Sequence, residues 1–205
     1  RFPRAPALVR TMEKAGQVKI YEKVVYRDPF GDPIEPDTPP PLTAEQAEAV
    51  ETMLPLLGKG FKTVLLAGVT GSGKTEVYLR LTRAALKKGL RVLVLVPEIA
   101  LISQTERWFR ARFGETVAVL HSGISRGERY DQWLRIARGE ASIAIGARSC
   151  IFAPFDKVGL IIVDEEHRFG VAHKEKLKAF KATVDVMSMT ATPIPRTLNM
   201  ALIGL

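Results

Sequence analysis

The sequence predicts an α/β fold in which helices cover both faces of a mainly parallel, doubly wound sheet. From residue 42 onward, short and continuously apolar runs alternate with segments that have helical periodicity. Such runs are typical of strands buried on both faces, and their alternation with helices is typical of a parallel sheet. The length of 205 residues accommodates one large domain, or a smaller domain with an appendage.

The first 41 residues differ in composition from the rest, because they hold eight of the thirteen prolines. We expect a short helix at residues 7–15, and a strand or hairpin arm at residues 18–26, where apolar and polar side chains alternate. Prolines exclude a regular helix or central strand from residues 28–41, so this segment is expected to be an extended linker. Residues 1–27 are too few to bury a core alone, and the chain lacks an initiator Met, so we expect it to be a piece of a longer protein.

The regular part of the fold is expected to begin with a helix at Thr43. Gln46 stands three residues later, which is the spacing of a capping box. The strands expected after this helix are residues 63–67, 91–96, 117–120, 142–145, 160–163 and 184–189. The helices expected between them are residues 74–88, 100–113, 128–138 and about 172–181.

A phosphate-binding loop is the strongest functional signal. Residues 68–75, Gly-Val-Thr-Gly-Ser-Gly-Lys-Thr, match G-x-x-x-x-G-K-[ST] between a predicted strand and a predicted helix. Glycines let the backbone approach phosphate, and the N–H groups of the loop and helix supply partial positive charge. Lys74 is expected on the β- and γ-phosphates, and Thr75 on magnesium. The candidate nucleotide-binding residues of the loop are Gly68, Thr70, Gly71, Ser72, Gly73, Lys74 and Thr75.

A second part of the site is expected where the predicted strand at residues 160–163 ends in Asp164 and Glu165. Open α/β sheets bind ligands at this edge. Asp164 would hold magnesium through water, and Glu165 would orient and deprotonate the attacking water. A solvated acidic loop is the alternative. His167 is a candidate sensor beside them, and Thr190 and Thr192 bring two hydroxyls to the same edge.

Charge and composition limit the classes of partner that the chain is expected to have. Lys and Arg number 30 against 22 acidic residues, which gives a net charge of +8 and favours polyanions, nucleic acid first. A single cysteine, Cys150, excludes an internal disulfide and a multi-cysteine zinc site. The sequence has no apolar run long enough to span a bilayer. We expect no membrane partner and a cytoplasmic location.

These motifs together resemble a known family. Gly-Ser-Gly-Lys-Thr, Asp-Glu-Glu-His and Thr-Ala-Thr, in this order, resemble motifs I, II and III of superfamily 2 helicases. Leu-Thr-Ala-Glu-Gln at residues 42–46 resembles the upstream Q-type motif, whose glutamine, here Gln46, reads adenine. The resemblance implies that residues 42–205 are a RecA-like P-loop NTPase lobe with motifs Q, I, Ia, Ib, II and III, which binds ATP and Mg²⁺. It also implies that residues 1–27 are the C-terminal remnant of a winged-helix domain, joined by the Pro-rich linker at 28–41.

Residues 1–166 are similar in particular to the PriA family of primosomal replication-restart helicases. The stretches that carry this similarity are residues 20–30, 68–79, 95–99 (Leu-Val-Pro-Glu-Ile), 121–123 (His-Ser-Gly) and 146–149 (Gly-Ala-Arg-Ser). Residues 164–205 are instead similar to the Mfd family of transcription-repair coupling factors, and slightly less to the RecG family of fork-regression helicases, on Met-Thr-Ala-Thr-Pro-Ile-Pro-Arg-Thr. A lineage that mixes both features would explain this, as would a chimera joined near residues 164–167, which we favour.

The resemblance implies a DNA translocase that contacts phosphates without reading sequence. The candidate DNA-binding residues are Arg148, Ser149, His121 and Ser122. Forked or branched DNA and other replication-restart proteins are the implied partners, and no zinc is expected in these residues. Trp108 and Trp133 have apolar neighbours, so core or interface packing is favoured over stacking with bases.

Catalysis in this family needs a second RecA-like lobe that supplies arginines to the transferred phosphoryl group. We expect that lobe to lie outside residues 1–205, and this chain alone to bind nucleotide weakly and hydrolyse ATP poorly. Two other functions stay open. A GTPase-like switch is disfavoured because the sequence has no Asn-Lys-x-Asp motif, and a non-catalytic module would bind DNA or protein without nucleotide.

Overall fold

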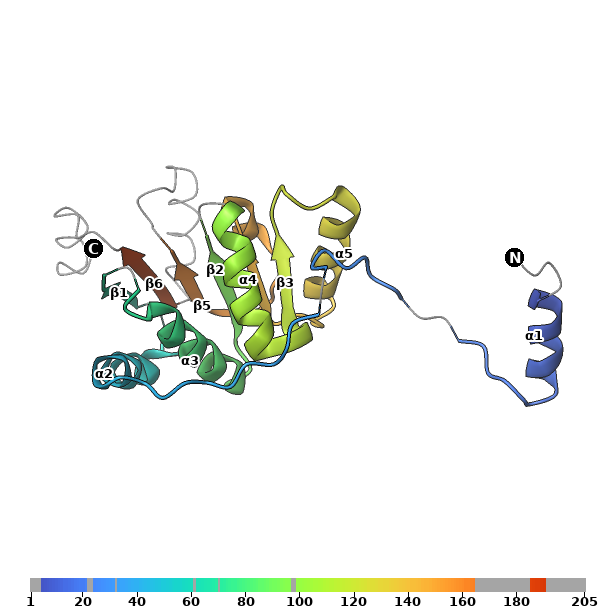
Figure 1. Cartoon of the computed structure of the whole chain (residues 1–205), viewed down its shortest axis with the longest axis horizontal. Coiled ribbons are helices and arrows are strands. Elements are labelled where there is room, and N and C mark those ends of the chain that lie inside the picture. Colours follow the sequence, from blue (N-terminus) through green and yellow to red (C-terminus); the bar gives the residue numbers. More distant parts are fainter. Residues whose placement is uncertain are drawn as a thin grey trace.

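The computed structural model describes residues 5–21, 24–31, 33–60, 62–69, 71–96, 99–164 and 185–190, with the backbone alone at residues 99, 148 and 185–190. The described strands form one six-stranded sheet in the order β1-β6-β5-β2-β4-β3, and all neighbouring pairs are parallel (Figure 1). The strands are β1 (Thr63–Ala67), β2 (Arg91–Leu95), β3 (Val117–Leu120), β4 (Ile143–Gly146), β5 (Val158–Val163) and β6 (Asp185–Thr190). The predicted parallel α/β fold is confirmed.

The strand bounds agree with the apolar runs, and the one real difference has a physical cause. β5 begins at Val158, two residues before the predicted start. Gly159 interrupts the apolar run at the point where the register between β2 and β5 shifts, with Arg91 opposite Val158 and Val92 opposite Leu160. A Cβ at Gly159 would lie 2.6 Å from the side chain of Leu90, so the bulge depends on glycine there.

Helices cover both faces of the sheet, as the doubly wound prediction requires. One apolar cluster joins the sheet to α2 (Ala44–Met53), α3 (Lys74–Lys87) and α4 (Ile99–Phe113). The other cluster joins the opposite face to α5 (Arg126–Ala137) and the 3-10 helix η3 (Arg148–Phe152). Two shorter 3-10 turns, η1 (Leu54–Leu56) and η2 (Gly114–Thr116), follow α2 and α4. None of the helices that the structure describes is long and apolar enough to cross a membrane.

Capping boxes fix the starts of two helices. Thr43 and Gln46 form the predicted capping box at α2. α5 begins at Arg126, two residues earlier than predicted, because Ser125 and Glu128 form a second capping box. The helix expected at residues 172–181 lies outside the described residues.

The N-terminal segment is partly as predicted. α1 (Ala5–Lys14) matches the expected helix, contributes no buried residue and lies apart from the lobe (Figure 1). The strand expected at residues 18–26 is wrong for the described residues 18–21 and 24–26, which form neither helix nor strand. Alternating side chains do not make a strand without a neighbouring strand, because the backbone N–H and C=O groups need partners. Here the amide of Ile20 donates instead to the Glu13 carboxylate, at 3.2 Å.

Candidate nucleotide site and nucleic-acid interface

The predicted phosphate loop connects β1 to α3 at the C-terminal edge of the sheet. Gly71 and Gly73 have φ angles of 82° and 79°, in the left-handed region that glycine adopts without strain. Gly73 is the N-cap of α3 and makes no side-chain cap hydrogen bond. The N–H groups at the start of this helix therefore face the loop without a side-chain acceptor, which fits an anion such as phosphate.

Lys74 directs its charge into this loop. Its Nζ donates to the carbonyl oxygens of Gly68, at 2.5 Å, and Val69, at 2.9 Å. Both acceptors are neutral, and hydrogen bonds from an ammonium to charged oxygens are stronger than those to neutral oxygens. Phosphate oxygens would thus replace the loop carbonyls as favourable partners, and the residues present fit a nucleoside polyphosphate.

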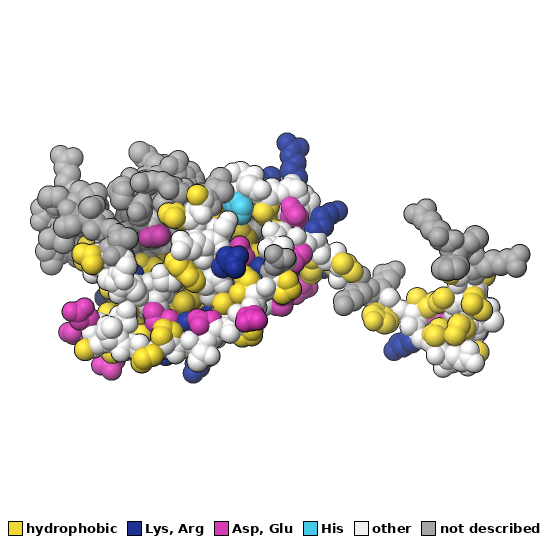
Figure 2. All heavy atoms as spheres, in the orientation of Figure 1, with side chains coloured by type: hydrophobic (Ala, Val, Ile, Leu, Met, Phe, Trp, Pro, Cys, Tyr) yellow, Lys and Arg dark blue, Asp and Glu magenta, His cyan; other side chains and the backbone are white. Residues whose placement is uncertain are grey.

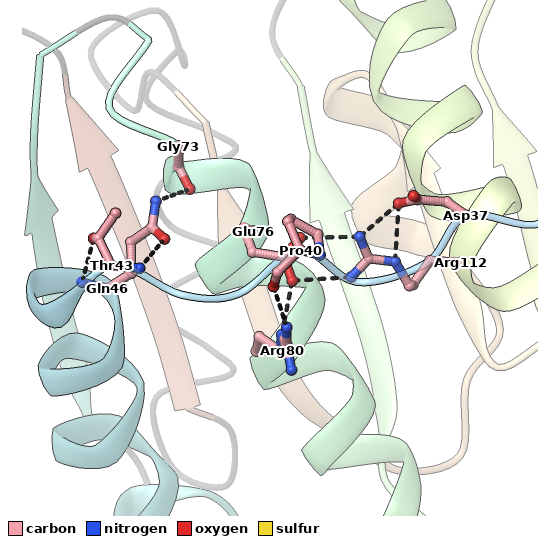
Figure 3. A network of polar contacts seen from close by, with 8 residues as sticks. All are labelled: Asp37, Pro40, Thr43, Gln46, Gly73, Glu76, Arg80 and Arg112. Atoms are coloured by element: carbon pink, nitrogen blue, oxygen red, sulfur yellow. Dashed lines mark hydrogen bonds and ion pairs between the residues drawn. The ribbon is translucent and has the colours of Figure 1, made fainter.

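Gln46 contacts the phosphate loop through its side chain, which the sequence did not predict. Its Oε1 accepts from the Thr43 amide at 3.0 Å, and its Nε2 donates to the Gly73 carbonyl at 3.5 Å (Figure 3). The same Nε2 donates to the Ser72 carbonyl at 3.1 Å. A Cβ at Gly73 would lie 2.3 Å from this Nε2. The start of α2 is therefore tied directly to the start of α3.

Asp164 lies at the predicted edge, directly after β5. Its amide donates to the Leu95 carbonyl at 2.9 Å, which continues the pairing of β5 with β2. Burial raises the pKa of Tyr78, one turn after Lys74 in α3, and the nearby negative charge of Asp164 raises it further. Tyr78 of α3 and the carboxylate of Asp164 are thus close enough to interact electrostatically.

β6 connects the two halves of this edge, since it lies between β1 and β5. Its last residue, Thr190, pairs with Ala67, the residue before Gly68. The backbone thus places Thr190 between the phosphate loop and Asp164. Four further candidates lie outside the described residues: Thr70, Glu165, His167 and Thr192.

The candidate DNA-binding residues come together at the other end of the same edge. Leu120 and Gly146, the last residues of β3 and β4, are paired, so the chain after each strand emerges at neighbouring positions. His121 and Ser122 follow β3, and Ser149 lies exposed in η3, a short 3-10 helix that begins at Arg148. Burial lowers the pKa of His121, and its Nδ1 accepts from the Gly123 amide at 3.0 Å, so both effects favour the uncharged imidazole.

A pocket of about 490 Å³ lies beside this edge, and the sequence did not predict it. α5 lines it with two arginines and two aromatic side chains at positions i, i+3, i+4 and i+7, which is the spacing of one helix face. These residues are Arg126, Arg129, Tyr130 and Trp133, and the rest of the wall consists of Leu120, Ser149, Phe152 and Ala153. Figure 2 shows Lys and Arg side chains standing out at the α5 end of the lobe.

Both tryptophans were expected to pack in the core or at an interface rather than to stack with bases, and the core alternative is wrong. The exposed fractions of Trp133 and Trp108 are 43% and 41%. The reason is visible on α5, where Gln132 and Ile136 occupy the buried face and turn Trp133 toward the pocket. Stacking with a base and packing against another domain both remain available to these side chains.

Comparisons with known proteins show the family of the chain. Residues 43–201 match the DEAD/DEAH box helicase family. The chain is 47% identical over 171 residues to the replication restart protein PriA of Bacillus subtilis, which covers 82% of this chain and 21% of that protein. It is 40% identical over 169 residues to the transcription-repair-coupling factor of Escherichia coli, covering 80% of this chain and 15% of that protein.

Among solved structures, RecG bound to a three-way DNA junction matches with a TM-score of 0.64 and 29% identity, over 82% of this chain and 23% of that chain. The chain spans about a fifth of the length of its PriA relatives. The family match extends from the capping box of α2, through the phosphate loop and Asp164, to the residues that follow β6. The lobe has the RecA-like helicase fold, and the chain belongs to the DEAD/DEAH box helicase family.

Proposed function

We propose that this chain is the ATP-binding lobe of an ATP-dependent DNA helicase that acts in replication restart. One observation carries the proposal: the Lys74 ammonium lies within the phosphate loop, at an uncapped helix start on the same sheet edge as Asp164. Nearly half-identical sequence in PriA proteins over four fifths of the chain supports the restart pathway. The cytoplasm is the expected location.

Each part of the nucleotide site has a proposed role. Gly68, Thr70, Gly71, Ser72 and Gly73 surround the phosphates with backbone N–H groups, and Lys74 pairs with the β- and γ-phosphates. Thr75 and Asp164 hold Mg²⁺, which neutralises phosphate charge when it is bound. Gln46 reads adenine from the start of α2.

Four further motif residues complete the proposal, of which only Thr190 lies within the described residues. Glu165 takes a proton from the attacking water, and His167 senses the state of the phosphates. Thr190 and Thr192 couple the site to DNA at the edge that β6 shares with the phosphate loop.

DNA is proposed to bind along the edge formed by β3 and β4. Arg148, Ser149, Ser122 and neutral His121 contact phosphates, which gives affinity without sequence preference. The pocket beside Ser149 supports this interface, because exposed aromatic rings next to arginines suit single-stranded bases. Forked or branched DNA and restart proteins are the proposed partners of the whole protein.

A nucleotide titration tests the enzyme proposal. ADP or ATP with Mg²⁺ is expected to raise the melting temperature. When the ligand is at 100 times its Kd, binding adds about 2.7 kcal/mol to the free energy of unfolding. The Lys74→Ala variant is expected to lose this shift. An equal shift in that variant would contradict the proposed site, and no shift in either protein would favour the non-catalytic module.

A transcription-repair coupling or fork-regression translocase is the second candidate. The 40% identity to the coupling factor and the likeness to RecG favour it, as does the similarity of residues 164–205. The longer protein that contains this chain separates the two. Strand separation at forks without RNA polymerase supports restart, whereas displacement of stalled polymerase supports coupling.

The N-terminal residues 1–27 are proposed to be the end of a winged-helix domain, with residues 28–41 as its linker. α1 supports this, because its Leu8 side chain is 61% exposed and apolar side chains gather on its surface (Figure 2). An apolar helix face without a partner in the lobe is what the remnant of a larger domain would present.

A further inference from the structure

The extended segment before α2 is packed on the lobe as a strap, which we define as residues 26–31 and 33–42. Its first part contacts α5: the Arg27 guanidinium pairs with Asp131 at 3.0 Å, and the Arg27 amide donates to the same carboxylate. Its middle part packs against α4, with the Phe30 ring 3.9 Å from the Arg110 guanidinium carbon. A linker that only spaces two domains would make few such contacts.

The last part of the strap joins a network of charges beneath the nucleotide site (Figure 3). The amide of Asp37 donates to the Ala111 carbonyl in the last turn of α4, at 2.8 Å. The Asp37 carboxylate accepts from Arg112 at 2.6 and 3.2 Å. Arg80 donates to the Pro40 carbonyl at 2.7 Å.

Both arginines of this network bind Glu76. Arg112 donates to the two carboxylate oxygens of Glu76 at 3.0 and 2.9 Å, and Arg80 donates to one of them at 2.7 Å. The Arg112 side chain is only 3% exposed. Two cations and two anions, Asp37 included, are therefore shared among α3, α4 and the strap, and the removal of one partner leaves a charge less well balanced.

Glu76 follows Lys74 and Thr75 in the first turn of α3. A shift of Arg112 or Arg80 acts on this turn through the Glu76 carboxylate, and a shift of the turn moves Lys74 relative to the loop. We propose that Asp37 is a positioning residue of the nucleotide site, which holds the first turn of α3 in its phosphate-binding position through Arg112 and Glu76. This inference rests on the proposed nucleotide function.

The proposal has a reciprocal consequence. If docking of Asp37 on α4 strengthens nucleotide binding by a given factor, nucleotide binding strengthens this docking by the same factor. The Asp37 amide reports docking directly, since its acceptor is a carbonyl of α4.

The test measures binding of a fluorescent ADP analogue with Mg²⁺ to the 205-residue chain. Asp37→Ala is expected to raise the Kd about fivefold, at the low end of typical coupling between sites, and Asp37→Glu to recover most of the affinity. Asp131→Asn is the matched control, because it removes another carboxylate that anchors the strap, one that pairs with Arg27 and not with the arginines bound to Glu76. Its Kd is expected to equal that of the unmodified chain.

Hydrogen exchange supplies a measurement that needs no variant. ADP is expected to slow exchange of the Asp37 amide in the unmodified chain. An unchanged Kd in Asp37→Ala, an equal loss in Asp131→Asn, or no slowing by ADP would overturn the proposal. Lys74→Ala separates the proposed nucleotide function from the proposed role of Asp37. If Lys74→Ala still binds ADP normally, the proposed function is wrong. If Lys74→Ala loses ADP binding while Asp37→Ala keeps it, only the proposed role of Asp37 is wrong.

Discussion

Gly73→Ala is expected to destabilise the lobe through two separable effects. The backbone at Gly73 has a φ of 79°, and a residue with a Cβ pays about 1–2 kcal/mol to adopt the left-handed region. The added Cβ would also lie 2.3 Å from Nε2 of Gln46. This nitrogen ends a flexible side chain, so Gln46 is expected to move aside and lose its hydrogen bonds to the loop, at a further cost of about 1 kcal/mol.

Gly71→Ala isolates the first effect. Gly71 has nearly the same φ, 82°, but a Cβ there meets no atom of the described residues within 4 Å. Both substitutions also restrict the unfolded chain equally, so this contribution cancels in the comparison. Gly73→Ala is therefore expected to cost about 1 kcal/mol more than Gly71→Ala, measured by urea unfolding monitored by circular dichroism.

A double-mutant cycle assigns that excess to Gln46. In a Gln46→Ala background the clash is absent, so Gly73→Ala is expected to cost no more than Gly71→Ala. Equal costs of the two glycine substitutions in the unmodified chain would refute the reasoning. So would an excess that persists without Gln46, because the amide contact would then not limit the loop.

Three further outcomes are expected. Burial would by itself raise the pKa of Glu76, but hydrogen bonds from two arginines outweigh this effect and keep the pKa below 4.5. The contribution of Glu76 to stability is therefore present above pH 4.5 and is lost as the pH falls below this value. Urea midpoints measured against pH should show this loss in the unmodified chain and not in Glu76→Gln. Binding to fluorescent single-stranded DNA is expected to be weak, and its affinity is expected to fall as the salt concentration rises. Arg148→Ala and Trp133→Ala should weaken binding, whereas Trp108→Ala, which alters a ring outside the pocket, should bind normally. Strong preference for one sequence would contradict the proposed interface. The chain alone is expected to hydrolyse ATP at a rate near background, without stimulation by DNA. Joining a second lobe from a relative should restore the activity, and Glu165→Gln in that fusion should remove it while ATP still binds. Vigorous DNA-stimulated turnover by the chain alone would contradict the two-lobe argument.

The sequence predicted the sheet well because β2, β3, β4 and β5 are buried on both faces along nearly all of their length. β3 has the predicted bounds, since a strand without a solvent face consists of one continuous apolar run. β1 also has the predicted bounds, although it is only partly buried. The phosphate loop was equally readable, because its glycines, Lys74 and Thr75 are adjacent in the chain. Asp164 could be placed because a strand carries its last residue to a known edge.

Contacts between segments that are distant in sequence could not be predicted. Asp37 meets Arg112 across 75 positions of sequence, and neither residue belongs to a periodic pattern that would pair them. The strand expected around residues 18–26 failed for the same reason, since a pairing partner is a property of the whole fold. The pocket had a local signal, the i, i+3, i+4 and i+7 spacing on α5, but that spacing equally describes a buried helix face.

The position of α3 explains why one helix connects all these features. Successive residues of a helix point about 100° apart, so its neighbours in sequence serve different surroundings. Lys74 faces the phosphate loop, Glu76 binds Arg112 of α4, and Tyr78 is buried near Asp164. Backbone hydrogen bonds between successive turns make the helix rigid, so these three residues move together. Any partner that lifts Asp37 from Arg112 would therefore act on the phosphate loop without touching the nucleotide.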